Sequence, residues 1–176
     1  PQTLITHLDL SGAHVIGEAA IALAEALPQT QVINLNLSSS MSSGAFRALA
    51  GALPQTLIMH LNLSGNWIND MRAKAIIQAL PDTQITHLNL SSNEISAHGE
   101  AAIFLAEALQ DSQITHLNLS RNRISTAAVR ALAEALPNTQ ITHLHLIMSD
   151  LSYEDKRIIR DAWIAKFGSA DGLIFL

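Results

Sequence analysis

The chain lacks cysteine, which excludes disulfide scaffolds, thiolate zinc sites, iron–sulfur clusters and cysteine nucleophiles. Aromatic residues make up only 4% of its 176 residues and charged residues 14%, whereas 48% are hydrophobic. The core should therefore be built from many Leu, Ile and Ala contacts rather than from rings. No apolar stretch reaches the roughly 20 residues of a membrane span, and no signal peptide is evident. We expect a soluble, cytoplasmic protein without a membrane partner.

Charge and motif content narrow the function classes further. Ten Lys and Arg residues against fifteen Asp and Glu give a formal net charge of −5, without the basic patch of a nucleic-acid-binding domain. The sequence has no Gly-rich phosphate loop, no G-x-S-x-G or H-E-x-x-H motif and no paired carboxylates at matched positions. We therefore expect no nucleic-acid partner, no cofactor, no bound metal, no catalytic residues and no enzymatic activity.

One seven-residue pattern returns six times along the chain. It alternates apolar and polar residues around a Leu-x-Leu pair, and successive pairs are separated by 27, 26, 27, 29 and 27 residues. Such alternation is typical of a short strand with one buried face. The six copies begin at Ile5, Val32, Ile58, Ile85, Ile114 and Ile141. The regular spacing predicts an array of stacked repeats rather than one irregular core.

A helical segment follows each of the first five strands. In each segment two Leu or Ile residues lie four apart on one helix face, with Ala between them. Four of the segments are followed directly by a Pro that should end the helix, namely Pro28, Pro54, Pro81 and Pro137. A unit this short cannot bury its apolar face alone, so we expect neighbouring units to stack. The result should be an α/β solenoid, curved because helices are wider than strands.

Residues 61–68 read Leu-Asn-Leu-Ser-Gly-Asn-Trp-Ile, which resembles the L-x-L-x-x-N-x-I motif of the leucine-rich-repeat superfamily; residues 88–95 and 117–124 match equally well. The repeat length is similar to that of the ribonuclease-inhibitor-like subclass. The resemblance implies a right-handed βα horseshoe with parallel strands on the concave face and helices on the convex face. It also implies that the motif Asn residues, Asn66, Asn93 and Asn122, hydrogen-bond the turn backbone. Looser turns are expected where other residues replace them, at Ala13, Ser40 and Ser149.

Residues 1–151 are predicted to form the six repeats, and residues 152–176 a C-terminal capping helix and tail within the same structural domain. Ser152 and Asp155 have capping-box spacing at the start of this helix. One helix face should seal the last repeat, with Trp163 in the core; it carries Ile159, Trp163 and Phe167. The apolar tail should either pack under the cap or mark a point where more chain continued. The first strand is preceded by no evident capping segment, so we expect that either earlier repeats or something else covers this end. For the chain as given we expect a monomer or weak self-association through it.

Side chains that flank the strand Leu residues should face the concavity in columns. One column is mostly His and the next mostly Asn, which makes partner-binding candidates of His60, His87, His116, His143, His145, Asn62, Asn89 and Asn118. Three interpretations of the His residues remain open. They are a polar repeat consensus, a pH-sensitive surface of stacked rings that repel once charged, or a metal site at His116, His143 and His145.

Residues that differ between repeats point to the loop rim beyond the strands. Trp and Arg dominate binding hot spots, and Trp67 should project outward because it lies between Asn66 and Ile68. Arg123 is either a binding residue or one half of a surface ion pair with Glu94 of the adjacent repeat. The rim candidates are Trp67, Glu94, Arg121 and Arg123.

These features predict a non-enzymatic protein–protein interaction module that binds a partner protein through the concave face and the loop rim. The units are similar to repeats in effectors that intracellular bacteria deliver into host cells, which implies a host partner and secretion into the host cell. Two alternatives remain open. One is a sensor or scaffold domain of an immune or regulatory protein. The other is a GTPase-activating or other enzyme-regulatory leucine-rich-repeat protein, with Arg121 or Arg123 at its rim.

Overall fold

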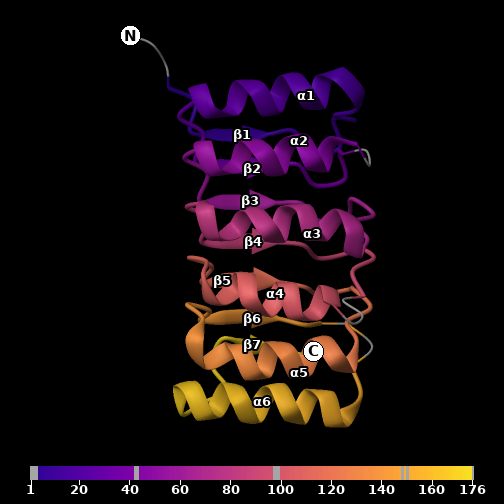
Figure 1. Cartoon of the computed structure of the whole chain (residues 1–176), viewed down its shortest axis with the longest axis vertical. Helices are drawn as coiled ribbons and strands as arrows, with labels where there is room; N and C mark the ends of the chain where they lie inside the picture. The colour runs from indigo at the N-terminus through magenta and orange to yellow at the C-terminus, as the bar shows by residue number, and fades with distance from the viewer. Residues whose placement is uncertain (1–3, 42–43, 97–99, 148, 150, 176) are drawn as a thin grey trace.

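Short strands and longer helices alternate along the chain in the computed structural model, which describes residues 4–41, 44–96, 100–147, 149 and 151–175 (Figure 1). Residues 1–3, at the start of the predicted array, lie outside the described residues. Within the described residues, seven strands form one parallel sheet in sequence order. They are His7–Asp9 (β1), Asn34–Asn36 (β2), His60–Asn62 (β3), His87–Asn89 (β4), His116–Asn118 (β5), His143–His145 (β6) and Leu173–Ile174 (β7). The first six lie where the alternating pattern predicts them.

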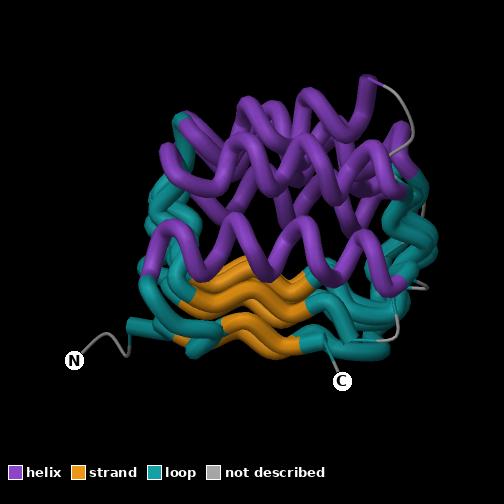
Figure 2. The backbone as a smooth tube through the Cα atoms, turned by 90° about the horizontal axis from the view of Figure 1, so that it is seen from below, coloured by secondary structure: helices purple, strands orange, loops and turns teal. Residues whose placement is uncertain are grey.

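The helices form a second layer over one face of this sheet (Figure 2). They are Gly17–Ala26 (α1), Ala45–Ala52 (α2), Asp70–Ala79 (α3), Glu100–Gln110 (α4), Thr126–Ala135 (α5) and Tyr153–Phe167 (α6). Where a Pro follows, the α-helix ends as predicted and the chain tightens into a 3₁₀ turn, as in Leu27–Gln29. Within the described part of the chain, none of the helices combines the length and apolar character needed to cross a membrane.

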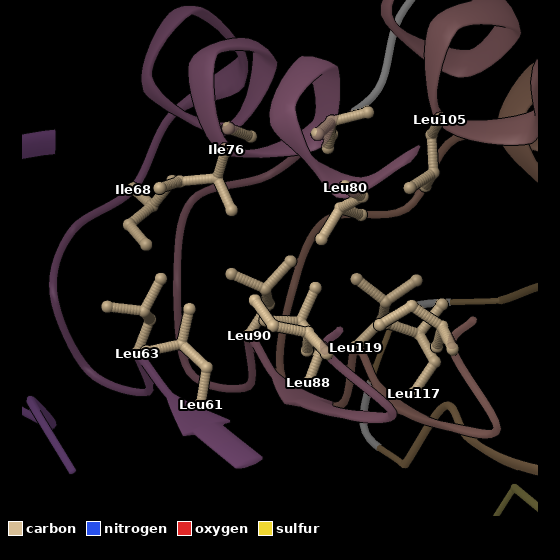
Figure 3. Packing of buried hydrophobic residues seen from close by; sticks show 14 of the residues in the cluster. Leu61, Leu63, Ile68, Ile76, Leu80, Leu88, Leu90, Leu105, Leu117 and Leu119 are labelled. Atoms are coloured by element: carbon tan, nitrogen blue, oxygen red, sulfur yellow. The ribbon is translucent and has the colours of Figure 1, made fainter. Parts of the chain in front are cut away.

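Rows of Leu and Ile from the two layers meet to form the core (Figure 3). The central Leu of every strand from β2 to β6 is at most 2% exposed. On the helix side, Ile76 and Leu80 of the third repeat are fully buried and Leu105 of α4 is 1% exposed. Burying each such side chain contributes about 1.5–3 kcal/mol. The core thus consists mainly of one aliphatic contact pattern repeated along the stack, to which Phe46 and Trp163 add two buried rings.

A column of hydroxyl groups closes the helix ends, and the sequence analysis missed it. In four repeats a Thr two residues after the Pro donates from Oγ1 to a Leu carbonyl three residues earlier, at 2.8–2.9 Å. These residues are Thr30, Thr56, Thr83 and Thr139; Ser112 takes the position after α4, at 3.2 Å. The last carbonyls of a helix have no partner within it. In the four Thr repeats the same carbonyl accepts from the Thr backbone N–H and from its hydroxyl, where the chain turns toward the next strand.

The motif Asn residues form the predicted ladder in the turns that follow the strands. Asn93 is 8% exposed, and its Oδ1 accepts from two backbone N–H groups at 2.9 and 3.0 Å. Its Nδ2 donates to the carbonyl oxygens of Leu90 and Leu63, at 2.9 and 3.1 Å. Asn66 makes the corresponding bonds one repeat earlier. Ser149, which replaces Asn in the last turn, reaches two carbonyls at 3.4 Å, so that turn is held less tightly, as expected.

The predicted C-terminal helix forms with its capping box. Ser152 and Asp155 exchange hydrogen bonds between side chain and backbone N–H, both at 3.1 Å. Ile159 and Trp163 are fully buried, which confirms the core interpretation of this Trp, whereas Phe167 remains 38% exposed. The helix therefore covers the last repeat mainly through two of the three predicted side chains.

The tail packs as β7, a strand that the sequence analysis did not predict. Leu144 N donates to Gly172 O at 2.7 Å, and Leu146 N donates to Ile174 O at 2.8 Å. Gly172 has φ of +82°, and a Cβ there would clash with the carbonyl oxygen of Thr142. Glycine is thus required for the tail to approach β6.

The opposite end of the stack leaves apolar side chains in solvent. Leu4 and Ile5, which precede β1, are 65% and 60% exposed, and Ile21 of α1 is 50% exposed. This confirms the expectation that the first strand has an uncovered apolar side.

Candidate functional site

The open sheet face, the side of the sheet turned away from the helices, carries two columns of polar side chains. The first column contains His7, Asn34, His60, His87, His116 and His143. The second contains Asp9, Asn36, Asn62, Asn89, Asn118 and His145. Parallel pairing places corresponding residues side by side, so all the predicted strand candidates share one surface. They line a hollow of about 480 Å³.

Four rings of the first column stack face to face. Their centroids lie 4.1, 3.9 and 4.0 Å apart, with interplanar angles of 22°, 12° and 8°. We call this set the His stack; it comprises His60, His87, His116 and His143. The neighbouring His7 does not join it, because Asn34 lies between them and donates from Nδ2 to His7 Nε2 at 2.8 Å.

A Thr hydroxyl positions each of the last three rings of the His stack. His87, His116 and His143 have Nδ1 within 2.9–3.0 Å of Oγ1 of the preceding Thr. The same Oγ1 lies 3.1–3.3 Å from a backbone carbonyl of the preceding repeat. A carbonyl only accepts, so both contacts are satisfied when the hydroxyl donates to the carbonyl and Nδ1 carries hydrogen. In the neutral ring this leaves Nε2 as an acceptor.

Burial and mutual proximity lower the pKa of the two central rings. For His87, partial burial is the main cause, followed by repulsion from a charged His116. For His116, partial burial again comes first, followed by repulsion from His143 and His145. Both shifts favour the uncharged ring, in agreement with the pH-sensitive interpretation of the column.

The geometry does not support a metal site at His116, His143 and His145. Across the described residues, no group of three or more His, Asp or Glu side chains could hold a metal ion. The rings of His116 and His143 are nearly parallel, so their lone pairs point alongside one another and not toward a common centre. His145 lies in the other column, beside Asn118.

The Asn side chains of the second column are fixed by their own strand ends. Each Oδ1 accepts from the backbone N–H two residues later at 3.0–3.1 Å, in Asn36, Asn62, Asn89 and Asn118. This turn is a common local bond for Asn. With Oδ1 engaged, Nδ2 is the donor that the central Asn residues can offer to a partner.

The loop rim, at the ends of the strands, brings the four rim candidates to a second hollow of about 840 Å³. Trp67 is 72% exposed, as predicted, and its carbonyl accepts from Arg72 Nη1 at 2.6 Å. The Glu94–Arg123 ion pair, one of the two interpretations of Arg123, is not formed: over the residues that the structure describes, the one ion pair within 4 Å joins Arg157 and Glu154.

Left-handed backbone recurs along the loop rim. The turn position occupied by Gly12, Ser39, Gly65, Ser92 and Arg121 has φ between 50° and 69° in every described repeat. Trp67 also has positive φ, of 54°. Bulky residues in this region are uncommon, and such strained positions cluster at functional sites.

Comparison with known proteins agrees with the repeat geometry. A sequence model of the leucine-rich repeat matches residues 55–71, 83–103 and 112–133. Each segment contains one strand and one motif Asn, at Asn66, Asn93 and Asn122. The fold is an α/β leucine-rich-repeat solenoid. No curated protein sequence matches it significantly.

Solved structures share the architecture of this solenoid at low sequence identity. Actin-binding site 2 of leiomodin-1 is 18% identical with a TM-score of 0.70, covering 85% of this chain and 88% of that one. The tropomodulin C-terminal domain of Caenorhabditis elegans is 17% identical with a TM-score of 0.68, covering 86% and 93%. An internalin from Listeria monocytogenes is 18% identical with a TM-score of 0.50, covering 89% of this chain and 44% of that one. These likenesses concern the fold.

The solenoid thus gathers the candidate residues in two places, the open sheet face and the loop rim. Sequence reasoning missed the residues that position them. The Thr that precedes most His residues belongs to the repeated segment, so it reads as consensus, and Arg72 is an ordinary charged helix residue in the sequence. The ribonuclease-inhibitor-like subclass remains a prediction.

Proposed function

We propose that the solenoid is a non-enzymatic protein-interaction module that binds a partner protein across the open sheet face and the loop rim. Trp67 carries the proposal: the residue is 72% exposed, lines the rim hollow and has left-handed backbone. Trp and Arg are the residues most enriched in binding hot spots. Arg121 and Arg123 line the same hollow.

The dimensions of the open sheet face support the use of both surfaces. Six strands about 4.8 Å apart, each of three residues at about 3.3 Å, project to roughly 300 Å². A standard interface buries about 800 Å² on each partner. The rim would supply the remaining area.

The proposal extends to the context of the module. Residues 1–151 would be the recognition array and residues 152–176 its cap, which the packing of α6 and β7 supports. The repeat sequence resembles that of bacterial effectors, so we propose a host protein as the partner and the host cell as the place of action. Capture from host-cell lysate, compared with bacterial lysate, tests this point.

The test of the rim is quantitative capture with Trp67→Ala, with Met71→Ala as the matched control. Met71 is 83% exposed on the neighbouring helix but does not line the rim hollow. We expect Trp67→Ala to weaken binding at least about tenfold, or 1.4 kcal/mol, and Met71→Ala to leave it unchanged. Equal effects of the two substitutions, or none from Trp67→Ala, would contradict the rim assignment.

Two defined assays complement capture from lysate. The leiomodin-1 neighbour is described as an actin-binding site, so actin filaments are the first purified partner to test, by co-sedimentation. The second assay measures GTP hydrolysis by a GTPase to which the protein is added. If the protein stimulates hydrolysis and Arg121→Ala/Arg123→Ala does not, it belongs instead to the enzyme-regulatory class.

A further inference from the structure

The His stack presents a row of acceptor atoms, and this inference, which rests on the proposed function, concerns the partner that such a row fits. The Thr contacts assign the hydrogen to Nδ1 in His87, His116 and His143. Their Nε2 atoms then carry lone pairs at neutral pH. Rings stacked at 3.9–4.1 Å repeat this acceptor from one strand to the next.

The first repeat shows one such acceptor with its bond made. Asn34 donates from its carboxamide Nδ2 to His7 Nε2 at 2.8 Å, while Thr6 Oγ1 lies 2.9 Å from Nδ1 of the same ring. A carboxamide nitrogen can only donate. His7 is thus a neutral ring with hydrogen on Nδ1, and its Nε2 accepts a hydrogen bond from a side-chain amide on the same surface.

The surroundings of the His stack decide which donors suit it. The flanking column offers Asn62, Asn89 and Asn118, which are uncharged, and His145. Next to the stack, β2 carries Asn34 and Asn36 and β7 carries Leu173 and Ile174, none of which titrates. Farther away, β1 holds His7 and Asp9, and Asp171 precedes β7. The helices are separated from the stack by the Leu core.

A charged partner fits this setting poorly. The four strands of the His stack carry no carboxylate, so a seated ammonium or guanidinium would lose water without gaining a counter-ion. A carboxylate is itself an acceptor and cannot bond to an unprotonated Nε2. Neutral amide and hydroxyl donors meet neither penalty.

We propose that the His stack binds a helical segment of a partner protein through neutral side-chain donors, carboxamides or hydroxyls, that bond to the Nε2 atoms. The i, i+3 and i+4 side chains of a helix lie about 5–6 Å apart, close to the spacing of the stacked rings. Same-face side chains of an extended strand lie about 6.6 Å apart, farther from the ring spacing. Protonation of Nε2 removes the acceptor, so this contact weakens as the rings become charged.

The test uses the ¹⁵N-labelled full chain, nuclear magnetic resonance of the imidazole nitrogens, and three Ala-based helical peptides. The peptides are identical except for four residues on one face, which are Gln, Glu or Lys. At pH 7.5 we expect Nδ1–H signals for His87, His116 and His143, and Nε2 shifts on addition of the Gln peptide but not of the Glu or Lys peptide. Lowering the pH from 7.5 toward 5 should weaken binding of the Gln peptide.

A ring-preserving variant separates hydrogen bonding from packing. His87→Phe/His116→Phe keeps two aromatic rings but removes their Nε2 atoms, and we expect it to weaken binding of the Gln peptide at least tenfold. The control Tyr153→Phe, at an exposed position on α6 away from the His stack, should bind like the parent chain. The proposal is overturned by Nε2–H tautomers, by equal or stronger binding of a charged peptide at pH 7.5, or by no response to the Gln peptide. If Trp67-dependent capture of a protein persists in that case, the proposed function stands without this inference.

Discussion

At the scale of single residues, buried Asn side chains hold the turns that carry the rim. The Asn93 carboxamide accepts from two N–H groups and donates to three carbonyl oxygens, all of them in the backbone. Asn138 has the same chemistry but is exposed, with its Nδ2 3.4 Å from Gln110 Oε1. The two residues therefore form a matched pair for measuring what the ladder contributes.

Asn93→Ala should lower the free energy of unfolding by about 3 kcal/mol, because it leaves several buried backbone groups unpaired. Asn138→Ala should change it by no more than about 0.5 kcal/mol. Urea denaturation followed by circular dichroism measures both values. Similar losses for the two variants would mean that the ladder is not a main source of stability.

Arg121 and Arg123 differ in backbone conformation although both are exposed rim residues. Arg121 has φ of 55°, at the position that Gly12 and Gly65 occupy in other repeats, whereas Arg123 has no positive φ. Arg121→Gly relieves strain and should leave unfolding free energy within about 0.5 kcal/mol of the parent, whereas Arg123→Gly should cost about 0.5–1 kcal/mol. Thermal unfolding measures the difference. A greater loss for Arg121→Gly would show that its side chain stabilises the fold rather than serving recognition.

At the scale of elements, β7 depends on the absence of a side chain at Gly172. Gly172→Ala would introduce a clash with the Thr142 carbonyl on left-handed backbone, so we expect a loss of about 2 kcal/mol or more. Gly51→Ala, inside α2 with open space around the added methyl, should instead stabilise by about 0.5–1 kcal/mol. Amide exchange at Leu144 and Leu146, which donate to β7, locates the effect. Unchanged exchange at both amides in Gly172→Ala would contradict this view of the tail.

The elements that the sequence predicts are those whose pattern repeats. Strand Leu residues alternate with polar ones, and the motif Asn sits at fixed spacing, so a strand, a turn and a buried face follow from period and residue type alone. β7 could not be found in this way, because Leu173–Ile174 stands outside the repeat and is too short to show a period.

The sequence predicts which residues of the candidate site share a face of the sheet, but not the tautomer of the His rings or the backbone strain at the rim. Register follows from the repeat, which placed the His and Asn columns correctly. The hydrogen on Nδ1 depends on the distance of a Thr hydroxyl from a carbonyl of another repeat, and the strain at Trp67 and Arg121 depends on backbone angles. Neither quantity can be read from residue types.

At the scale of the whole molecule, the His stack joins four repeats whose stability should depend on pH. Folding lowers the pKa of His87 and His116. As the pH falls below about 6.5, the ordinary His pKa, these two residues are therefore protonated in the unfolded chain before they are protonated in the folded chain. Stability should therefore be full above about pH 6.5 and fall as the pH decreases toward the folded-state values. Asp9 and Asp155, whose pKa values lie below the usual 3.8, change charge outside this window.

Thermal melts at pH 7.5 and pH 5 measure this dependence, and we expect the lower Tm at pH 5. His87→Asn/His116→Asn, which places in the column the residue already present at Asn34, should reduce the difference between the two pH values. A Tm difference that persists unchanged in this variant would assign the pH dependence to other groups.

The ring separations of 3.9–4.1 Å in the His stack are shorter than the spacing of about 4.8 Å between neighbouring strands. These rings therefore lie closer together than the strands that carry them, and any loosening of the His stack would move them apart. Charge on the rings favours that separation, whereas uncharged rings attract one another. Protonation and ring separation are consequently coupled: the rings should lie farther apart in acid, and an applied force that separates them should raise their proton affinity.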